Sequence, residues 1–264
     1  MAISLADIKR NTMGPPRIVI YGTPGVGKTT LAAQIPSAVW IPVEDGLAGL
    51  NVDAFPSPKD YGDLLECIGK LCNDPHAFST VVIDSISAIE PMLTDYVVAT
   101  VPHQDKGSKV ANIDGYGFHK GHKTHAPNEW RNFRSGLDAL REKGMQVVLL
   151  GHSTVERFED PSTDPYDRYQ LAIGKYSEPV IYDWADAVLF MGYKVATVGD
   201  DRKRGVGAGD RRIYTAERPS FRAKNRYRMP FEIAVPENKP EAAWNVIAEC
   251  IANVANPQPT NATV

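Results

Sequence analysis

The chain has 264 residues, of which 43% are hydrophobic and 23% charged, and its net charge is −3. These values are those of an ordinary globular protein and fit one large domain better than two small ones. No stretch approaches the roughly 20 apolar residues that a membrane span needs. The three cysteines form no CxxC pair and the N-terminus is not a signal peptide, so we expect a cytoplasmic protein without disulfides or a membrane partner.

The charge is unevenly distributed along the chain. Between Asp200 and Pro230, ten basic residues stand against four acidic ones, a net charge of +6 that leaves −9 for the rest. An acidic body with a basic stripe is more informative about partners than the net charge. Within the stripe, FRAKNRYRMPF at 221–231 places Arg or Lys at alternating positions, as in a strand. One explanation is a solvated edge strand that is charged against aggregation.

Short apolar runs alternate with segments of helical spacing. We expect strands over Arg17–Tyr21, Ala38–Val43, Thr80–Ile83, Gln146–Leu150 and Trp184–Met191. We expect helices over Lys28–Ile35, Pro58–Asn73, Ile86–Val98, Asn128–Lys143 and Glu241–Val254. The runs Tyr193–Val198 and Arg211–Ala216 predict a hairpin with a disordered basic tip. This order predicts an α/β fold with a mostly parallel central sheet, helices on both faces and a C-terminal β-hairpin.

Two segments lack a clear period and are predicted to be long loops. They are 101–127, here called the first loop, and 153–177, the second loop. Loops of this length are often functional, and both are expected on the side where open α/β sheets bind ligands. Residues 1–15 are expected to be an extension, 16–254 one domain and 255–264 a disordered tail.

The stretch from Gly22 to Thr29, GTPGVGKT, matches the phosphate-loop pattern GxxxxGK[ST], with a strand expected before it and a helix after it. Glycines let successive backbone N–H groups converge on phosphate oxygens. In such loops the Lys reaches the β- and γ-phosphates and the Thr hydroxyl ligates Mg²⁺. We therefore predict that ATP and Mg²⁺ bind here, through Gly22, Thr23, Pro24, Gly25, Val26, Gly27, Lys28, Thr29 and Thr30. The alternative is an ordinary glycine-rich turn.

Acidic residues follow two of the expected strands. Asp84 ends the run TVVID and is predicted to hold the Mg²⁺ shell together with Thr29, although it could also cap the helix that follows. Glu44 and Asp45 come directly after the second strand. Because hydrolysis needs a group that activates water, we predict Glu44 as the catalytic base. The alternative for either residue is a turn carboxylate.

These motifs together resemble the RecA-like recombinase ATPase core. The resemblance rests on the strand, P-loop and helix, on IPVEDGL with Glu44, on VVIDSISAI with Asp84 and on VVLLGHS with His152. PYDRYQ at 165–170 and WADAVLF at 184–190 are similar, more narrowly, to phage-encoded AAA-type nucleotide-binding proteins of the single-strand annealing recombinase group. The resemblance covers roughly Pro16 to Phe231.

The resemblance implies a role for several positions. Glu44 would activate the attacking water. His152 would take the place of a γ-phosphate sensor, which is usually Gln in this family. The alternative for His152 is a histidine at a strand end that forms hydrogen bonds with the backbone only. Lys224-Asn225-Arg226 matches a Lys-Asn-Lys segment that reaches a neighbouring subunit's nucleotide. This implies a homo-oligomer, a ring or filament with ATP at its interfaces. The catalytic set would be Glu44, Lys28, His152, Lys224 and Arg226.

The resemblance also implies that the two loops face single-stranded DNA. Aromatic rings stack on bases and cations neutralise phosphates, so we predict DNA contacts by Tyr116, Phe118, His119, Lys120, Lys123 and Lys175. Acidic residues in the middle of the second loop weaken its electrostatic case. Two alternatives for the first loop are a solvated basic loop and a metal site of His119, His122 and His125, which has no associated Cys or clustered carboxylate.

The function predicted from the sequence is that of an ATP-dependent, single-stranded-DNA-binding recombinase or annealing protein. It would work in the host cytoplasm if phage-encoded, with a single-strand-binding protein as a further partner. The alternative is an ATP-dependent switch or loader that acts through a protein partner without touching DNA. A small-molecule kinase is disfavoured because the chain shows no lid with paired arginines.

Overall fold

The computed structural model describes residues 13–103, 107, 109–198 and 204–255, together with Ser4 and Ile8; for 195–198 and 204–208 it describes the backbone alone. Most of the expected extension at 1–15, the centre of the hairpin tip at 199–203 and the tail from 256 onward lie outside the described residues. The predictions made for those segments stay predictions.

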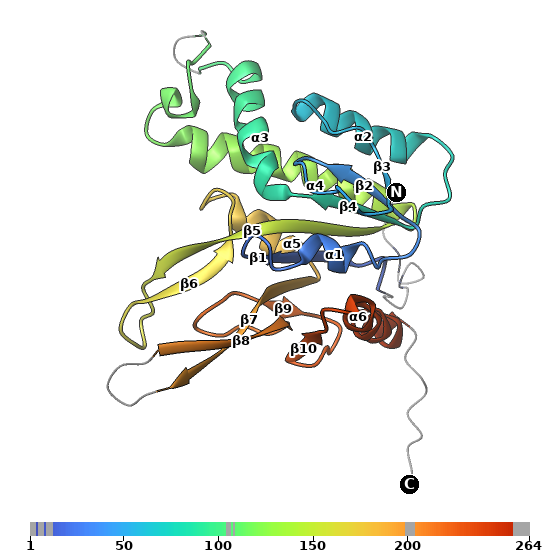
Figure 1. The fold of residues 1–264 in the computed structure, drawn as a ribbon. Coiled ribbons are helices and arrows are strands. Elements are labelled where there is room, and N and C mark those ends of the chain that lie inside the picture. Colours follow the sequence, from blue (N-terminus) through green and yellow to red (C-terminus); the bar gives the residue numbers. More distant parts are fainter. Residues whose placement is uncertain are drawn as a thin grey trace.

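Across the described ranges the strands form a ten-stranded mixed sheet with the order β10-β8-β7-β1-β5-β4-β2-β3, to which β6 and β9 are added beside β5 and β7 (Figure 1). The strands are β1 Arg17–Gly22, β2 Ala38–Pro42, β3 Asp53–Ala54, β4 Thr80–Asp84, β5 Gln146–Phe158, β6 Tyr166–Leu171, β7 Ala187–Val198, β8 Arg204–Tyr214, β9 Lys224–Asn225 and β10 Glu232–Val235. The strands from β7 to β3 in this order are parallel, whereas β6, β8, β9 and β10 are antiparallel to their neighbours. The predicted, mostly parallel sheet is confirmed.

Helices cover both faces of this sheet because its strands bury alternate residues on opposite sides. Val19 and Tyr21 of β1 belong to the core under α2, α3, α4 and α5, whereas Ile18 and Ile20 face α1 and α6. The helices are α1 Lys28–Ala32, α2 Tyr61–Asn73, α3 Ile86–Thr100, α4 Ala126–Glu142, α5 Glu178–Trp184 and α6 Pro240–Ala255, with short turns of helix η2 Ile113–Tyr116 and η3 Gly121–His125 before α4. The predicted helices on both faces are confirmed.

The second loop is largely a β-hairpin, so the prediction of a loop over 153–177 is wrong. Strand β5 continues to Phe158 and pairs antiparallel with β6. Backbone pairing holds the two strands together, and the rings of Phe158 and Tyr166 contact each other across them at 5.6 Å, with the Arg168 guanidinium 3.8 Å from the Phe158 ring centroid. Sequence periodicity missed it because a hairpin that projects from the core needs no buried, apolar face.

The end of the fifth expected strand and the hairpin after it also differ from prediction. Trp184 ends helix α5 instead of starting a strand, and β7 is one continuous strand through the two runs expected to be separate. Strand β8 begins at Arg204, so part of the expected disordered tip is ordered β-structure. The expected hairpin is confirmed, with longer arms.

The basic stretch at 221–231 is not one strand. Only Lys224–Asn225 pair with β7, and Arg228 has a positive φ of 54°. The Asn225 side chain turns the chain, since it donates to the Thr215 carbonyl and accepts from the Met229 N–H. The stretch therefore does not line up its cations on one strand face, and each finds its own surroundings.

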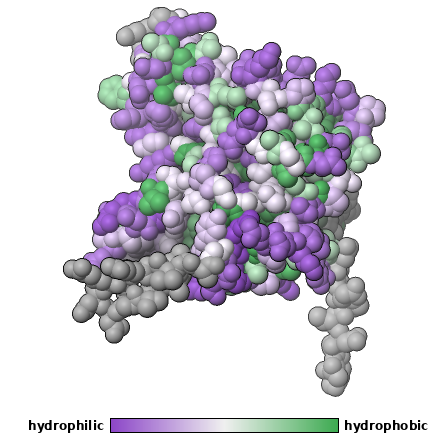
Figure 2. Space-filling model, in the orientation of Figure 1, coloured by the Kyte–Doolittle hydropathy of each residue, from purple (hydrophilic) through white to green (hydrophobic). Residues whose placement is uncertain are grey.

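The visible surface carries no broad apolar area. Figure 2 shows hydrophobic residues scattered among hydrophilic ones over the face seen there. Within the part of the chain that the structure describes, no helix combines the length and the apolar character that crossing a membrane requires.

A glycine at the end of β1 is required by packing. A Cβ on Gly22 would lie 2.0 Å from the backbone oxygen of Met191. Gly22→Ala is therefore expected to destabilise the protein by about 3 kcal/mol, because the backbone of β7 must move. Gly69→Ala is the matched control, since a Cβ there meets nothing within 4 Å on helix α2 and is expected to stabilise by about 1 kcal/mol. Urea denaturation of both variants measures the difference, and equal stabilities would contradict it.

Candidate active site

The loop between β1 and α1 has the backbone of a phosphate-binding loop. Gly25 and Gly27 take positive φ angles of 75° and 99°, which glycine adopts without strain. The Lys28 side chain folds back over the loop and donates to the carbonyls of its first two residues, both at 3.1 Å. Lys28 is only 6% exposed. Such a loop presents several N–H groups and one buried cation to the same small volume.

An oxygen-bearing pair lies beside this loop. The Thr29 hydroxyl donates to Asp84 Oδ2 at 2.8 Å. Asp84 is the last residue of β4 and is only 3% exposed. Burial raises the pKa of Asp84, opposed by the Thr29 hydrogen bond and by the charge of Lys28. Burial also lowers the pKa of Lys28, which Asp84 and Glu44 counteract. The three charges are thus electrostatically coupled, and the two oxygens suit a hard cation such as Mg²⁺.

Glu44 follows β2, and His152 lies within β5 at the level where β5 pairs with Gly22, the end of β1; the two side chains face each other. His152 Nε2 lies 3.1 Å and 3.2 Å from the two carboxylate oxygens of Glu44. The backbone N–H groups of Val43 and Glu44 both donate to the Asp84 carbonyl, which fixes the carboxylate beside the Thr29–Asp84 pair. The backbone N–H of His152 donates to Ser87 Oγ at 3.0 Å. The structure thus brings Lys28, Thr29, Glu44, Asp84 and His152 together at one edge of the sheet.

Comparison with known families agrees with this arrangement. The family model described as an AAA domain matches residues 14–227, which include every residue of the cluster. The chain belongs to the AAA-domain family. No match was found among curated proteins. The AAA domain is thus a P-loop ATPase-like domain whose activity depends on a nucleotide, and its α/β architecture is that of a P-loop nucleotide-binding fold.

Lys224 and Arg226 lie at the opposite edge of the AAA domain's sheet. Arg226 contacts the buried Asp186 at 3.1 Å, directly beside the start of β1, where Arg17 pairs with the same carboxylate at 2.8 Å. Burial by itself would raise the pKa of Asp186. Hydrogen bonds from Arg17 outweigh this effect and hold the pKa of Asp186 below its ordinary value. Lys224 packs on the Tyr182 ring, and burial lowers its pKa. Five residues of β1 separate this edge from Gly22, about 16 Å, beyond the reach of an arginine side chain.

The first loop divides into a buried part and an exposed part. Tyr116 is 4% exposed and donates to two backbone carbonyls at the end of α3, so burial removes it from the predicted DNA contacts. Phe118 follows it and is 93% exposed, at a positive φ of 47°. The other side chains predicted to contact DNA are exposed as well: His119, Lys120, Lys123 and Lys175. Lys123 lies over the ring of Tyr176, which joins the first loop to the second.

The three first-loop histidines have separate surroundings. His122 lies 3.1 Å from Asp114, and His125 packs against the ring of Tyr116. Throughout the described ranges, no three His, Cys, Asp or Glu side chains gather as a metal site would require.

One side chain that lies near the phosphate loop belongs to none of the sequence motifs. Arg211 of β8 reaches the loop at Gly27, where a Cβ would lie 2.7 Å from its Nη1. Its carboxylate partner is Glu237, at 3.4 Å. In the sequence, Arg211 is one of the ten basic residues of the stripe at 200–230, and no motif assigns it a role. The alternation of side chains along the expected strand indicates that Arg211 and Ile213 share a face. It does not indicate that this strand lies close to β1 and its phosphate loop.

Proposed function

We propose that this AAA domain is a Mg²⁺-dependent ATPase whose active site is the cluster at the carboxyl edge of the sheet. The observation that carries the proposal is the Glu44 carboxylate, held by His152 next to the Thr29–Asp84 pair and the buried Lys28. A phosphate bound by the loop would meet a cation, a metal-binding oxygen pair and a carboxylate that can accept a proton. These are the parts that phosphoryl transfer to water requires.

Each residue then has a defined task. The loop N–H groups and Lys28 bind the phosphates. The Thr29 hydroxyl and Asp84 would hold Mg²⁺, which supplies charge neutralisation on the phosphates when bound. Glu44 accepts a proton from the attacking water, and His152, in contact with both carboxylate oxygens, orients Glu44 and senses the γ-phosphate.

We further propose that the site is completed by a neighbouring subunit. Lys224 and Arg226 are too far from their own phosphate loop to reach it, and Arg226 keeps more than half of its side chain exposed at 54%. A head-to-tail contact would bring this edge of one subunit to the nucleotide of the next, and such contacts build rings or filaments. The cations would then stabilise charge that develops on the γ-phosphate.

The substrate on which this ATPase acts is proposed to be single-stranded DNA, with recombination or annealing as the outcome. The exposed ring of Phe118, flanked by Lys120 and Lys123, has the composition of a base-stacking site. The backbone turns at this point, where Gly117, Phe118 and His119 all have positive φ angles, and the Phe118 ring is free to contact a base. The rival is a nucleotide-dependent switch or loader that works through a protein partner.

The proposed function is tested by ATP hydrolysis with and without a single-stranded oligonucleotide, at low and high salt. We expect strong stimulation by DNA that fades with salt, because about four neutralised phosphates give a salt slope on the order of −3. Lys28→Ala is expected to abolish turnover and serves as the control for contaminating ATPases. Turnover in the wild type that DNA leaves unchanged at any salt would favour the partner-dependent switch.

Phe118→Ala is expected to weaken oligonucleotide binding about 5- to 150-fold, because one stacked base contributes about 1–3 kcal/mol. Fluorescence anisotropy with a labelled oligonucleotide measures the affinity. Tyr193→Ala is the matched control, since Tyr193 is another exposed aromatic residue but lies on β7. Equal affinities of wild type and Phe118→Ala would remove the first loop as a stacking site.

A further inference from the structure

A second cation reaches the phosphate loop from a distant part of the chain. Strand β7 sets Met191 opposite Gly22 of β1, and β8 sets Arg211 opposite Tyr193, two residues beyond this level. Arg211 therefore stands just past the carboxyl end of β1. Because side chains alternate along a strand, it projects on the same face as Ile213, which is buried in the core with α1. The register directs its guanidinium onto the start of α1.

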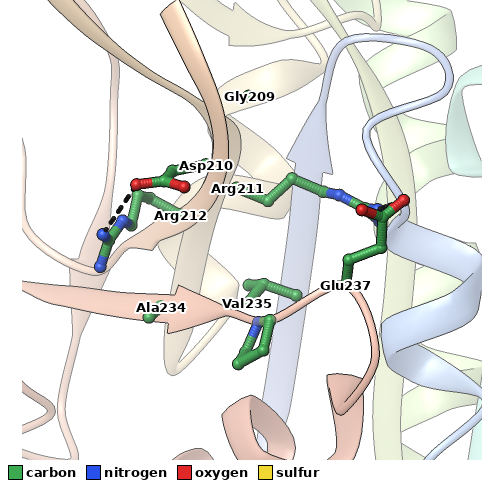
Figure 3. A pocket seen from close by; sticks show the side chains of 8 residues that line it. Gly209, Asp210, Arg211, Arg212, Ala234, Val235 and Glu237 are labelled. Carbon is green, nitrogen blue, oxygen red and sulfur yellow. Dashed lines mark hydrogen bonds and ion pairs between the residues drawn. The ribbon is translucent and has the colours of Figure 1, made fainter.

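The contacts of Arg211 agree with this placement. Nη1 is 2.7 Å, and Cδ 3.8 Å, from the position that a Cβ on Gly27 would take. Figure 3 shows the side chain extended toward the phosphate loop, with its guanidinium beside Glu237. Arg211 and Glu237 line a pocket of about 300 Å³ formed between β8 and the end of β10. The other residues that line it belong to β8, to β10 and to the segment after β10, so Arg211 is the side chain that connects this pocket to the phosphate loop.

The neighbouring arginine behaves differently. Arg212 projects on the opposite face of β8 and pairs with Asp210 at 3.5 Å (Figure 3). It also pairs with Glu232 at 3.2 Å. Among the residues that the structure describes, Arg211 forms one ion pair, with Glu237, whose side chain is 83% exposed. An ion pair with so exposed a carboxylate contributes little to stability. A phosphate oxygen would be a stronger partner, because a guanidinium binds phosphates through charge-assisted, bidentate hydrogen bonds.

We propose that Arg211 donates hydrogen bonds to a phosphate of the nucleotide bound by the loop of its own subunit, while Glu237 positions the guanidinium. The inference rests on the proposed nucleotide binding. A guanidinium has five N–H donors, so Arg211 can contact Glu237 and a phosphate at the same time. Unlike Lys224 and Arg226, Arg211 needs no neighbouring subunit. It also connects strand β8 directly to the occupancy of the nucleotide site.

The test is fluorescence titration of the full chain with a fluorescent ADP and Mg²⁺. Arg211→Ala is expected to weaken ADP binding about tenfold or more, the effect of losing hydrogen bonds to a charged group. Arg211→Lys keeps the charge but not the bidentate geometry, and should weaken binding severalfold. Arg212→Ala is the matched control and should bind ADP within about twofold of wild type. Competition by pyrophosphate should weaken in Arg211→Ala to the same degree as ADP binding does.

The outcomes separate this inference from the proposed function. If wild type binds ADP, Lys28→Ala does not, and both Arg211 variants bind as wild type does, the inference is wrong and the nucleotide site stands. If Arg211→Ala loses affinity for ADP but not for pyrophosphate, Arg211 contacts the nucleoside and the phosphate assignment is wrong. If wild type binds no nucleotide, both proposals fail. Arg211→Lys provides the measurement if Arg211→Ala does not fold.

Discussion

Replacement of Glu44 by Gln is expected to lower ATP turnover by about 10²- to 10⁴-fold, the contribution of a general base. Glutamine has nearly the same size and can still hydrogen-bond to His152, which lies 3.1 Å from the Glu44 carboxylate. It cannot accept the proton of the attacking water. ATP affinity should therefore stay within a few-fold of wild type, since the phosphate loop and the Thr29–Asp84 pair are untouched.

Steady-state hydrolysis and nucleotide titration on the same preparation check this prediction. Asp45→Asn is the matched control, because Asp45 is the next residue, is exposed and also loses its negative charge. We expect the control to hydrolyse ATP within a few-fold of wild type. A Glu44→Gln protein that turns over as fast as the control would show that another group activates the water.

Two inactive variants are expected to regain activity when mixed, if the site is shared between subunits. Arg226→Ala should lower turnover about 10³-fold, the lower range for an arginine supplied to a phosphoryl-transfer site. It should still fold, because Arg17 keeps its pairing with Asp186 at 2.8 Å. In an equal mixture with Lys28→Ala, about a quarter of the head-to-tail interfaces would combine an intact loop with an intact Arg226. Turnover should rise to a comparable fraction of wild type.

The control for mixing is a pair whose lesions lie in the same half of the site. Lys28 and Glu44 belong to one subunit's cluster, so Lys28→Ala mixed with Glu44→Gln restores no complete site at any ratio. ATP hydrolysis measured across a series of mixing ratios should show a maximum for the first pair and none for the second. A flat series for both pairs would refute the shared site.

Local sequence patterns were sufficient for much of the fold and of the cluster. The alternation of apolar strands with helices required a covered parallel sheet, because an apolar strand must bury both faces. In such a sheet the carboxyl ends of strands share one edge, so residues that follow different strands meet. Asp84 ends its strand, Glu44 follows one, and His152 follows the run Gln146–Leu150 that was predicted as a strand, although β5 continues past it to Phe158. These sequence positions placed all three near the phosphate loop before any distance was known.

Local sequence patterns could not predict the polar hairpin β5–β6 or the burial of Tyr116. A hairpin that projects from the core is held by backbone pairing and by cross-strand contacts such as that of Phe158 with Tyr166, which leave no apolar period to detect. Tyr116 stands in a run of Gly, His and Lys with an exposed Phe118 two residues later, and composition does not distinguish the two rings. Two carbonyls at the end of α3 accept from the Tyr116 hydroxyl, and that contact is long-range.

By itself, the sequence determined the α/β class, the phosphate loop and the residues at the carboxyl ends of the strands, because these depend on neighbours along the chain and on one general rule of parallel sheets. Only the tertiary structure decided that Arg211 lies on the phosphate loop and that Lys224 and Arg226 lie at the far edge. Strand order and register set those positions. They depend on which strands pair across the sheet, through contacts such as that of Gly22 with Met191, 169 positions away, and no local pattern carries that information.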